Sequence, residues 1–309
     1  FKKKSSKKLL GKFDKILKET ESEVFDSTKT LYILNKEFNF NFKIKDLKKF
    51  QKFQNVAIIG MGGSILGAEA IYNFFKNKIK KKFYFFNNLN EDEVTNFKKE
   101  INLSKVLFII ISKSGNTVET ISNMFSLKII KRNAKNIILI SEKNNNSLHF
   151  LAKKYSLFFV EHKNYIGGRY SVLSEVGTIP ALLMGINVIK LRSKILNVLN
   201  KKEKYFLKES TVNLVRLMSF KKIKTIVFLN YVPELEKFLY WCQQLIAESL
   251  GKNNKGFLPM ISNVPKDHHS LLQLYLDGPK DKLFHIFYIN KKSKEKINLN
   301  KFMKSNRYL

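Results

Sequence analysis

The chain has 309 residues, a formal net charge of +32 and a hydrophobic fraction of 44%. This apolar content excludes a disordered charged tail, because disorder requires low hydrophobicity together with high charge. At about 100–200 residues per domain, the length suggests two domains, each large enough to bury a core.

The single cysteine, Cys242, cannot form a disulfide within the chain, which is typical of a reducing compartment. No run of about 18 charge-free apolar residues occurs. We therefore expect a cytoplasmic protein without a membrane partner.

The first half of the chain alternates apolar runs with helix-length segments. An amphipathic helix is expected over residues 9–34, since apolar and charged positions alternate there at helical spacing. The strands that follow are continuously apolar, so both faces of their sheet are covered, and the alternation with helices implies parallel pairing. These strands are expected at 56–60, 83–88, 106–112, 136–141 and 157–161.

The second half repeats this pattern after a long helical stretch expected over about 180–220, which would join the two halves. Strands are expected at 224–231, 257–262 and 284–289, with helices at 233–251 and 270–276. The sequence therefore predicts an α/β fold with two doubly wound parallel sheets in αβα layers. Residues 1–190 would hold the N-terminal helix and the first domain, and residues 191–309 the linker helix and an incomplete second domain.

A glycine-rich turn, Gly60-Met61-Gly62-Gly63-Ser64, follows the first strand. Ligands of open parallel sheets bind beyond the carboxyl ends of the strands, and glycines there let backbone N–H groups approach an anion. Gly62, Gly63 and Ser64 are therefore candidate binding residues. A dinucleotide fingerprint is disfavoured because Ile65 occupies the place of its third glycine. Tight packing of the strand against the next helix would also explain the turn.

A hydroxyl-rich segment follows the third strand, in the order Ser-Lys-Ser-Gly-Asn-Thr. Hydroxyls and N–H groups at a helix start suit a phosphate monoester, a compact dianion. A Ser or Thr helix cap is the simpler reading, but a cap needs only one hydroxyl. The candidate phosphate-binding residues are Ser112, Lys113, Ser114 and Thr117.

Charged and amide side chains supply the candidates for acid–base chemistry. Arg169 follows Gly168 in a glycine pair and could stabilise developing negative charge, or it could pair with a carboxylate on the surface. Gln244 and Glu248 lie four positions apart on one helix face, and a carboxylate in the last turn opposes the helix dipole, which favours a functional role.

Two adjacent histidines, His268 and His269, stand at the start of a predicted helix. A metal site would need further ligands at suitable spacing, and neither Cys242 nor a nearby carboxylate pattern supplies them. We interpret the pair as acid–base residues rather than as metal ligands.

Together these segments resemble the phosphoglucose isomerase family, which is built of two sugar-isomerase domains. The match covers about residues 56–279 and rests on motifs in the family's order: IIGMGGSILG, SKSGNTVET, GGRYSVLSEVG, AESLGK and HHSLLQLYLDGP. The paired glycines before Arg-Tyr-Ser are the most specific element. The resemblance implies interconversion of D-glucose 6-phosphate and D-fructose 6-phosphate in glycolysis and gluconeogenesis, without a metal or organic cofactor.

The resemblance also implies roles for individual residues. Ser112, Ser114 and Thr117 match the phosphate loop, and Ser64 is similar to a position bordering the sugar phosphate. Arg169 matches the arginine that stabilises an enediolate. Glu248 matches the base that moves a proton between C1 and C2, and Gln244 a neighbour of that base. His269 matches the ring-opening histidine, which in the family reaches the partner subunit's site and so implies a homodimer.

One family motif is missing. The chain has no Q-x-G-V-E-x-x-K segment, whose lysine assists ring opening, and it begins with Phe1. We expect a fragment of a longer protein.

Two alternative functions stay open: a non-catalytic sugar-phosphate regulator, and an isomerase that also accepts mannose 6-phosphate. A nucleic-acid partner is not predicted, because such proteins concentrate their cations on one face, whereas the lysines here are scattered along the chain in small groups.

Overall fold

The computed structural model describes residues 3–193, 195–199, 201–219 and 223–290. Its first unit is a parallel five-stranded sheet in the order β2-β1-β3-β4-β5. The strands correspond to the apolar runs expected from the sequence: β1 Asn55–Ile59, β2 Lys82–Phe86, β3 Val106–Ile111, β4 Ile137–Ser141 and β5 Phe158–Glu161. Every residue of β3 and β4 is buried, as continuous apolar runs require.

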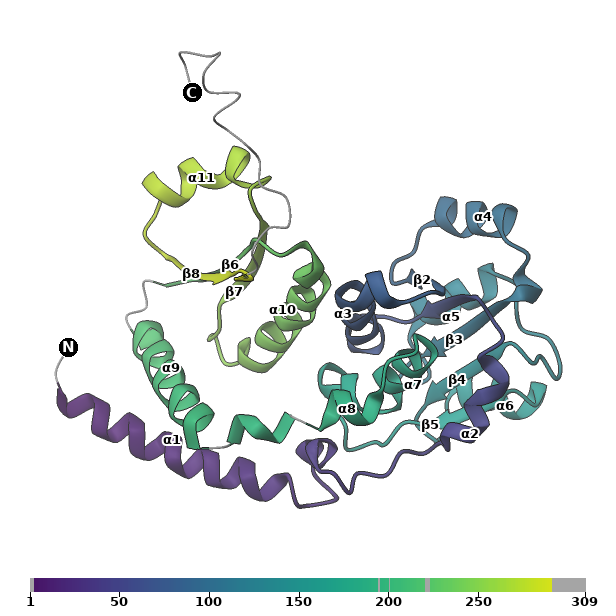
Figure 1. Cartoon of the computed structure of the whole chain (residues 1–309), viewed down its shortest axis with the longest axis horizontal. Coiled ribbons are helices and arrows are strands. Elements are labelled where there is room, and N and C mark those ends of the chain that lie inside the picture. Colours follow the sequence, from purple (N-terminus) through teal and green to yellow (C-terminus); the bar gives the residue numbers. More distant parts are fainter. Residues whose placement is uncertain (1–2, 194, 200, 220–222, 291–309) are drawn as a thin grey trace, which may run out of the picture.

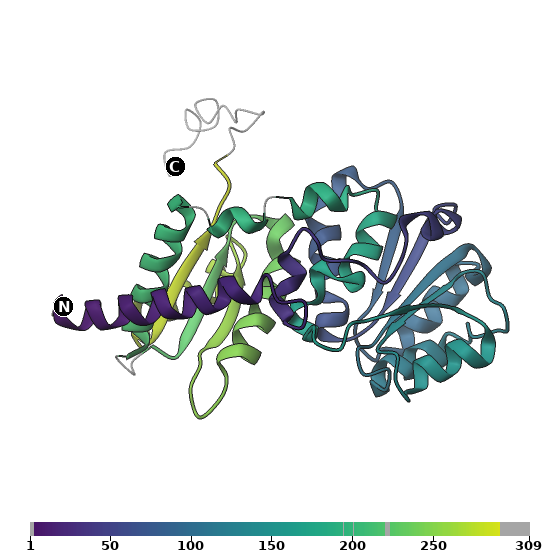
Figure 2. The ribbon, with the colours of Figure 1, turned by 90° about the horizontal axis from the view of Figure 1, so that it is seen from below.

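Helices cover both faces of this sheet, as Figures 1 and 2 show. One core cluster joins alternate strand residues, such as Ile58 and Ile109, to helices α3 and α7. The other cluster joins the intervening residues, such as Ile59 and Phe108, to helices α4, α5 and α6. The bounds of these helices are α3 Leu66–Phe75, α4 Glu91–Glu100, α5 Val118–Ser126, α6 Ser147–Tyr155 and α7 Glu175–Leu183.

The second unit is a parallel three-stranded sheet in the order β7-β6-β8. Its strands are β6 Thr225–Asn230, β7 Leu258–Asn263 and β8 Lys282–Phe287. Helix α10 (Glu236–Leu250) lies against one face of the sheet and α11 (His268–Asp277) against the other (Figure 1). The expected architecture of two parallel α/β sheets, the second one smaller, is confirmed. The boundary at residues 190 and 191 stays a prediction.

The segment between the two sheets differs from the expected long helix. It is broken into α7, α8 (Val188–Arg192), a short 3-10 turn (Ile195–Leu199) and α9 (Lys201–Ser219). The break after α7 has a local cause, because Gly185 adopts a left-handed backbone with φ +82° and the Asn187 side chain caps α8.

The N-terminal helix is also shorter than expected. Helix α1 covers Lys3–Glu23, and a 3-10 turn over Thr30–Leu34 replaces its predicted end. Helix α1 packs beside α9 (Figures 1 and 2), where Lys208 pairs with Asp14 at 2.8 Å. The short helix α2 (Ile44–Leu47) leads into β1.

Helix α10 and the turn before it attach the second unit to the first, and the candidate site lies between the two units. Helix α10 packs along α3, where the Asn73 amide donates to the carbonyls of Pro233 and Glu234. In the first sheet the strand order reverses at β1, because β2 lies on one side of it and β3 on the other. Ligands of such sheets bind beyond the carboxyl ends of the strands at this reversal, which here are β1 and β3. Gln244 and Glu248, in the C-terminal half of α10, line a cavity with Gly62, which follows β1.

Candidate active site

The glycine turn after β1 contacts the segment that carries Arg169. Gly62–Ser64 forms a 3-10 turn, η3, and Gly168–Leu173 forms another, η6. The Ser171 hydroxyl bridges the two turns, because its single proton is shared between the carbonyl oxygens of Gly63, at 3.0 Å, and Gly168, at 2.7 Å. Because η3 and η6 pack directly on each other, the structure brings Gly62, Gly63, Gly168 and Arg169 together.

The hydroxyl-rich segment forms a compact loop after β3. The Ser112 oxygen lies 2.8 Å from that of Thr117 and 3.5 Å from that of Ser114, and it accepts the N–H of Gly115 at 3.1 Å. Thr117 is the residue before α5, so the loop leads directly into a helix N-terminus. Hydroxyls and free N–H groups at such a position can bind a phosphate.

The segment that follows β4 fixes the conformation of the hydroxyl-rich loop after β3. Gly115 has φ +69°, and a side chain on it would overlap the amide of the buried Asn146. The Leu148 N–H donates to the Gly115 carbonyl at 3.1 Å, and the Ser147 N–H donates to the Asn116 side chain at 2.9 Å. The backbone of the loop is therefore fixed before any ligand binds.

Lys113 lies in this loop, but its ammonium group is directed to other partners. Nζ donates to the carbonyl of Asn164 at 2.8 Å and lies 3.6 Å from a carboxylate oxygen of Glu142. The structure therefore ties Lys113 to the ends of β4 and β5, and its binding role stays a prediction.

The acid–base candidates meet where α10 approaches η6. Arg169 Nη1 lies 3.3 Å from Glu248 Oε2, and the Gln244 amide donates to Glu248 Oε1 at 2.8 Å. Burial alone would lower the pKa of Arg169, but hydrogen bonds and charges from Tyr170 and Glu248 outweigh burial and raise it. The arginine therefore remains a permanent cation beside a carboxylate whose two oxygens each have a partner.

A cavity of about 630 Å³ opens beside this carboxylate. It extends from Gly62 and the carboxyl end of β2 to the start of β7, so both units contribute to it. Its lining contains the predicted residues Gly62, Gln244 and Glu248, and polar side chains to which the sequence assigned no role: Asn87, Asn88, Tyr240 and Gln243.

His269 is not brought into this group. It stands in the first turn of α11, on the opposite face of the second sheet from α10 and therefore from Glu248 (Figure 1). Its side chain is exposed, and its neighbour His268 packs against the Tyr231 ring at 6.0 Å.

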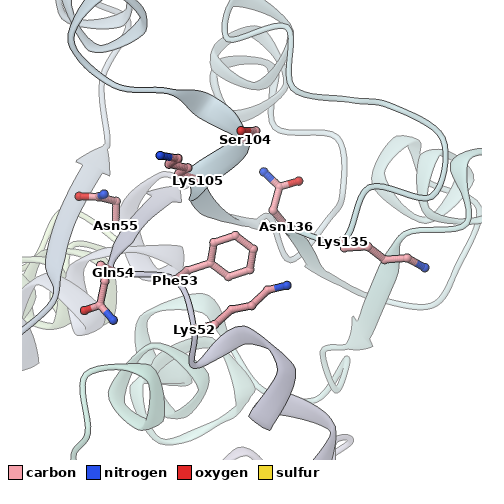
Figure 3. Close-up of a pocket in the computed structure, with 8 residues that line it drawn as sticks. All are labelled: Lys52, Phe53, Gln54, Asn55, Ser104, Lys105, Lys135 and Asn136. Carbon is pink, nitrogen blue, oxygen red and sulfur yellow. The ribbon is translucent and has the colours of Figure 1, made fainter.

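A separate hollow of about 530 Å³ lies at the opposite edge of the first sheet, where β1, β3 and β4 begin. Figure 3 shows the Phe53 ring at its centre, while the side chains of Lys105 and Lys135 point away to opposite sides. Because these ammonium groups diverge, they do not form a site for one compact anion.

Within the described residues, no group of three or more His, Cys, Asp or Glu side chains is arranged to hold a metal ion. The same part of the chain contains no helix with the length and apolar character needed to cross a membrane.

Comparison with known proteins assigns the chain to a family. The sequence pattern described as phosphoglucose isomerase matches residues 21–262. The chain belongs to this family. It is 37% identical to the glucose-6-phosphate isomerase of Methanocaldococcus jannaschii over 257 residues, which are 79% of this chain and 62% of that protein. It is 34% identical to a probable glucose-6-phosphate isomerase of Methanococcus maripaludis over 91% of this chain and 66% of that protein. The chain thus spans less than two thirds of these relatives' length.

Solved structures agree on the fold. A hypothetical protein of Thermus thermophilus superposes with a TM-score of 0.75 at 21% identity, covering 96% of this chain and 77% of that one. A glucose-6-phosphate isomerase of Chlamydia trachomatis gives a TM-score of 0.60 at 22% identity, covering 78% and 52%.

Sequence reasoning missed residues that hold Arg169 in place. The Trp241 indole donates to the Arg169 carbonyl at 2.9 Å, and the Ser249 hydroxyl accepts from Arg169 Nε at 3.0 Å. A signal for Trp241 was present, because it precedes Gln244 by three residues and Glu248 by seven, which places all three on one helix face. Ser249 carried no comparable signal.

Proposed function

We propose that this chain is the larger part of an aldose–ketose isomerase that interconverts D-glucose 6-phosphate and D-fructose 6-phosphate through a cis-enediolate. The observation that carries the proposal is the placement of the Glu248 carboxylate, between the Arg169 guanidinium and the Gln244 amide, beside a cavity at the junction of the two sheets. Removing a proton next to a carbonyl group requires a positioned base and a nearby cation, and this arrangement supplies both.

The phosphate group would bind in the loop after β3. The clustered hydroxyls of Ser112, Ser114 and Thr117 can donate to phosphate oxygens, and the start of α5 adds backbone N–H donors. The neighbouring turn with Gly62, Gly63 and Ser64 would border the sugar. Fixing one end of the substrate in this way lowers the entropic part of the barrier at the other end.

The proton transfer would take place at Glu248. Its carboxylate removes the proton from C2 of the open-chain aldose. The electron pair of the broken C–H bond forms the C1=C2 double bond, and the carbonyl electrons move to O1 to give the enediolate. The proton of the O2 hydroxyl then passes to O1, and the Glu248 carboxyl group returns its proton to C1 as the C2 carbonyl forms. Arg169 stabilises the negative charge on the enediolate oxygens. Gln244 donates to the second carboxylate oxygen and so fixes the direction in which the first one points.

Ring opening would be assisted by His269 from a second copy of the chain. The separation of His269 from Glu248 by the second sheet supports this arrangement, because the histidine and the base could then meet only across an interface. We accordingly propose a cytoplasmic homodimer with a sugar phosphate as its substrate and without nucleic-acid or membrane partners.

The test is a coupled assay of fructose 6-phosphate formation by the full-length gene product and by its Glu248→Gln variant. Gln keeps the size of the side chain and one acceptor oxygen but cannot take up a proton. We expect the variant to lose at least about 100-fold in kcat, the lower end of what a general base contributes. Undiminished turnover in the variant would refute the assignment.

The same preparation separates the two alternatives. A non-catalytic regulator would bind fructose 6-phosphate without converting it. An enzyme of dual specificity would convert mannose 6-phosphate as well, and we expect that reaction to depend on Glu248 in the same way.

A further inference from the structure

Arg169 is attached to α10 by its side chain as well as by its ion pair with Glu248. The Ser249 oxygen accepts a hydrogen bond from Arg169 Nε at 3.0 Å, and the guanidinium is only partly exposed. The donors of a guanidinium lie in one rigid plane, so a bond at Nε restricts the direction of both terminal nitrogens. Ser249 therefore affects where the Nη groups of Arg169 point.

The main chain of Arg169 is attached to the same helix. The Trp241 indole N–H donates to the Arg169 carbonyl oxygen at 2.9 Å, two helical turns before Ser249. Trp241 also packs its ring against Phe238, with centroids 5.8 Å apart, which restricts the rotation of the indole. One helix thus fixes both the backbone and the side chain of the arginine.

Tyr170 completes the arrangement from the side of η6. Its ring lies under the guanidinium, with Arg169 Cζ 4.7 Å from the ring centroid, and its hydroxyl is 3.2 Å from the Ser249 oxygen. Because Ser249 accepts from Arg169, its own proton is available for the Tyr170 oxygen. The hydroxyl of Ser249 therefore links the cation to the ring on which the cation stacks.

We propose that Ser249 is a positioning residue, which together with Tyr170 and Trp241 holds the Arg169 guanidinium where the enediolate charge develops. This inference rests on the proposed isomerase function. Ser249 itself would touch no reacting atom, since its hydroxyl is occupied by Arg169 and Tyr170. Its contribution would appear in the transition state, where the charge is present, more than in the bound substrate.

The test compares Ser249→Ala with Ser249→Thr, which keeps the hydroxyl, in the full-length gene product. Ser210→Ala, on the exposed surface of α9, serves as a matched control. For each protein, kcat and KM are measured with fructose 6-phosphate. Affinities are measured for inorganic phosphate and for 5-phosphoarabinonate, whose carboxylate imitates the enediolate charge.

We expect Ser249→Ala to lower kcat and to weaken 5-phosphoarabinonate binding by about 10- to 100-fold, the effect of misplacing one catalytic group. KM and the affinity for phosphate should stay near wild type, and Ser249→Thr should recover most of the loss. The control should behave as wild type.

The proposal would be overturned if Ser249→Ala kept wild-type kcat and analogue affinity in an active enzyme. It would also be overturned if phosphate and analogue binding fell together, because that pattern indicates a general structural defect. A wild-type protein that neither turns over fructose 6-phosphate nor binds the analogue would refute the isomerase assignment, and the positioning role with it.

Discussion

Gly63 and Gly168 lie in backbone contact, and this contact leaves no room for a side chain on Gly63. A Cβ built on Gly63 would overlap the carbonyl group of Gly168, whereas a Cβ built on Gly168 would meet no atom within 4 Å. The contact joins the turn after β1 to the turn that carries Arg169. The glycine at 63 is therefore required by packing between two turns that are far apart in the sequence.

Gly63→Ala should consequently destabilise the protein, by about 3 kcal/mol, the upper part of the range for overpacked sites. The Gly168 carbonyl belongs to the backbone and cannot rotate out of the way. Thermal unfolding followed by circular dichroism measures the effect, with Gly168→Ala as the matched control. Equal midpoints for the two variants would contradict this packing.

The hydroxyl of Ser112 should be needed for phosphate binding. It is buried and central to the loop, with Thr117 at 2.8 Å and the Gly115 N–H at 3.1 Å. Removing one hydrogen bond to a charged group costs about 1.5–3 kcal/mol, so Ser112→Ala should weaken fructose 6-phosphate binding by about 10- to 100-fold. Calorimetric titration measures this affinity.

Ser104→Ala, at the opposite edge of the first sheet, is the control for this substitution. It should leave the affinity unchanged. Equal affinities for wild type, control and Ser112→Ala would remove the loop from the binding site.

The buried His162 should make the fold sensitive to acid. Burial, and to a smaller extent the charge of Lys113, lowers its pKa from 6.5 to about 4, although a hydrogen bond to the Ile166 carbonyl opposes the shift. The unfolded chain then binds a proton at higher pH than the folded chain. Neutral His162 therefore contributes about 3 kcal/mol to the free energy of unfolding. This contribution is complete above pH 6.5 and is lost as the pH falls towards 4.

Urea unfolding between pH 4 and 7.5 tests this expectation. His162→Gln should show a weaker dependence over that range than wild type. If His162 were freely protonated in the folded state, the free energies of unfolding of the two proteins would change with pH in parallel, which would contradict this prediction.

The thiol of Cys242 should react slowly in the folded protein. It lies on α10 against the core of the second sheet, and burial raises its pKa to about 11. At pH 8 only about one thiol in a thousand is then ionised, so alkylation should be at least about 100-fold slower than for a free cysteine. Iodoacetamide labelling followed by mass spectrometry gives the rate.

The labelling rate of Cys242 in the folded protein is compared with two reference rates. The reaction should become fast in guanidinium chloride, and an exposed thiol from Ser210→Cys in a Cys242→Ala background should react fast without denaturant. Labelling of native Cys242 at the rate of the exposed thiol would show that the second unit does not bury this face of α10.

The sheets and loops could be predicted because their signals are local. Continuous apolar runs such as residues 106–111 mark strands that are covered on both faces, and glycines or hydroxyls directly after a strand mark its ligand-binding end. The break at Gly185 and Asn187 had a local signal as well, but hydrophobic spacing across the segment favoured one helix.

Contacts between distant segments could not be predicted in this way. The hydrogen bonds from Trp241 and Ser249 to Arg169 depend on how α10 packs on the first unit, and neither residue type indicates such a partner. The attachment of Lys113 to Glu142 and Asn164 likewise follows from the neighbouring strand ends. Residue type and spacing identified the chemical groups, and tertiary packing determined which of them meet.

The central claim is that Glu248 transfers a proton between two carbons of a sugar phosphate. It is tested most directly by incubating fructose 6-phosphate with the full-length gene product in deuterium oxide and following C1 and C2 by NMR. We predict that wild type places deuterium from the solvent on these carbons as it forms glucose 6-phosphate, and that Glu248→Gln places none above the rate without enzyme. Incorporation by Glu248→Gln at the wild-type rate, or none by wild type, would contradict the account.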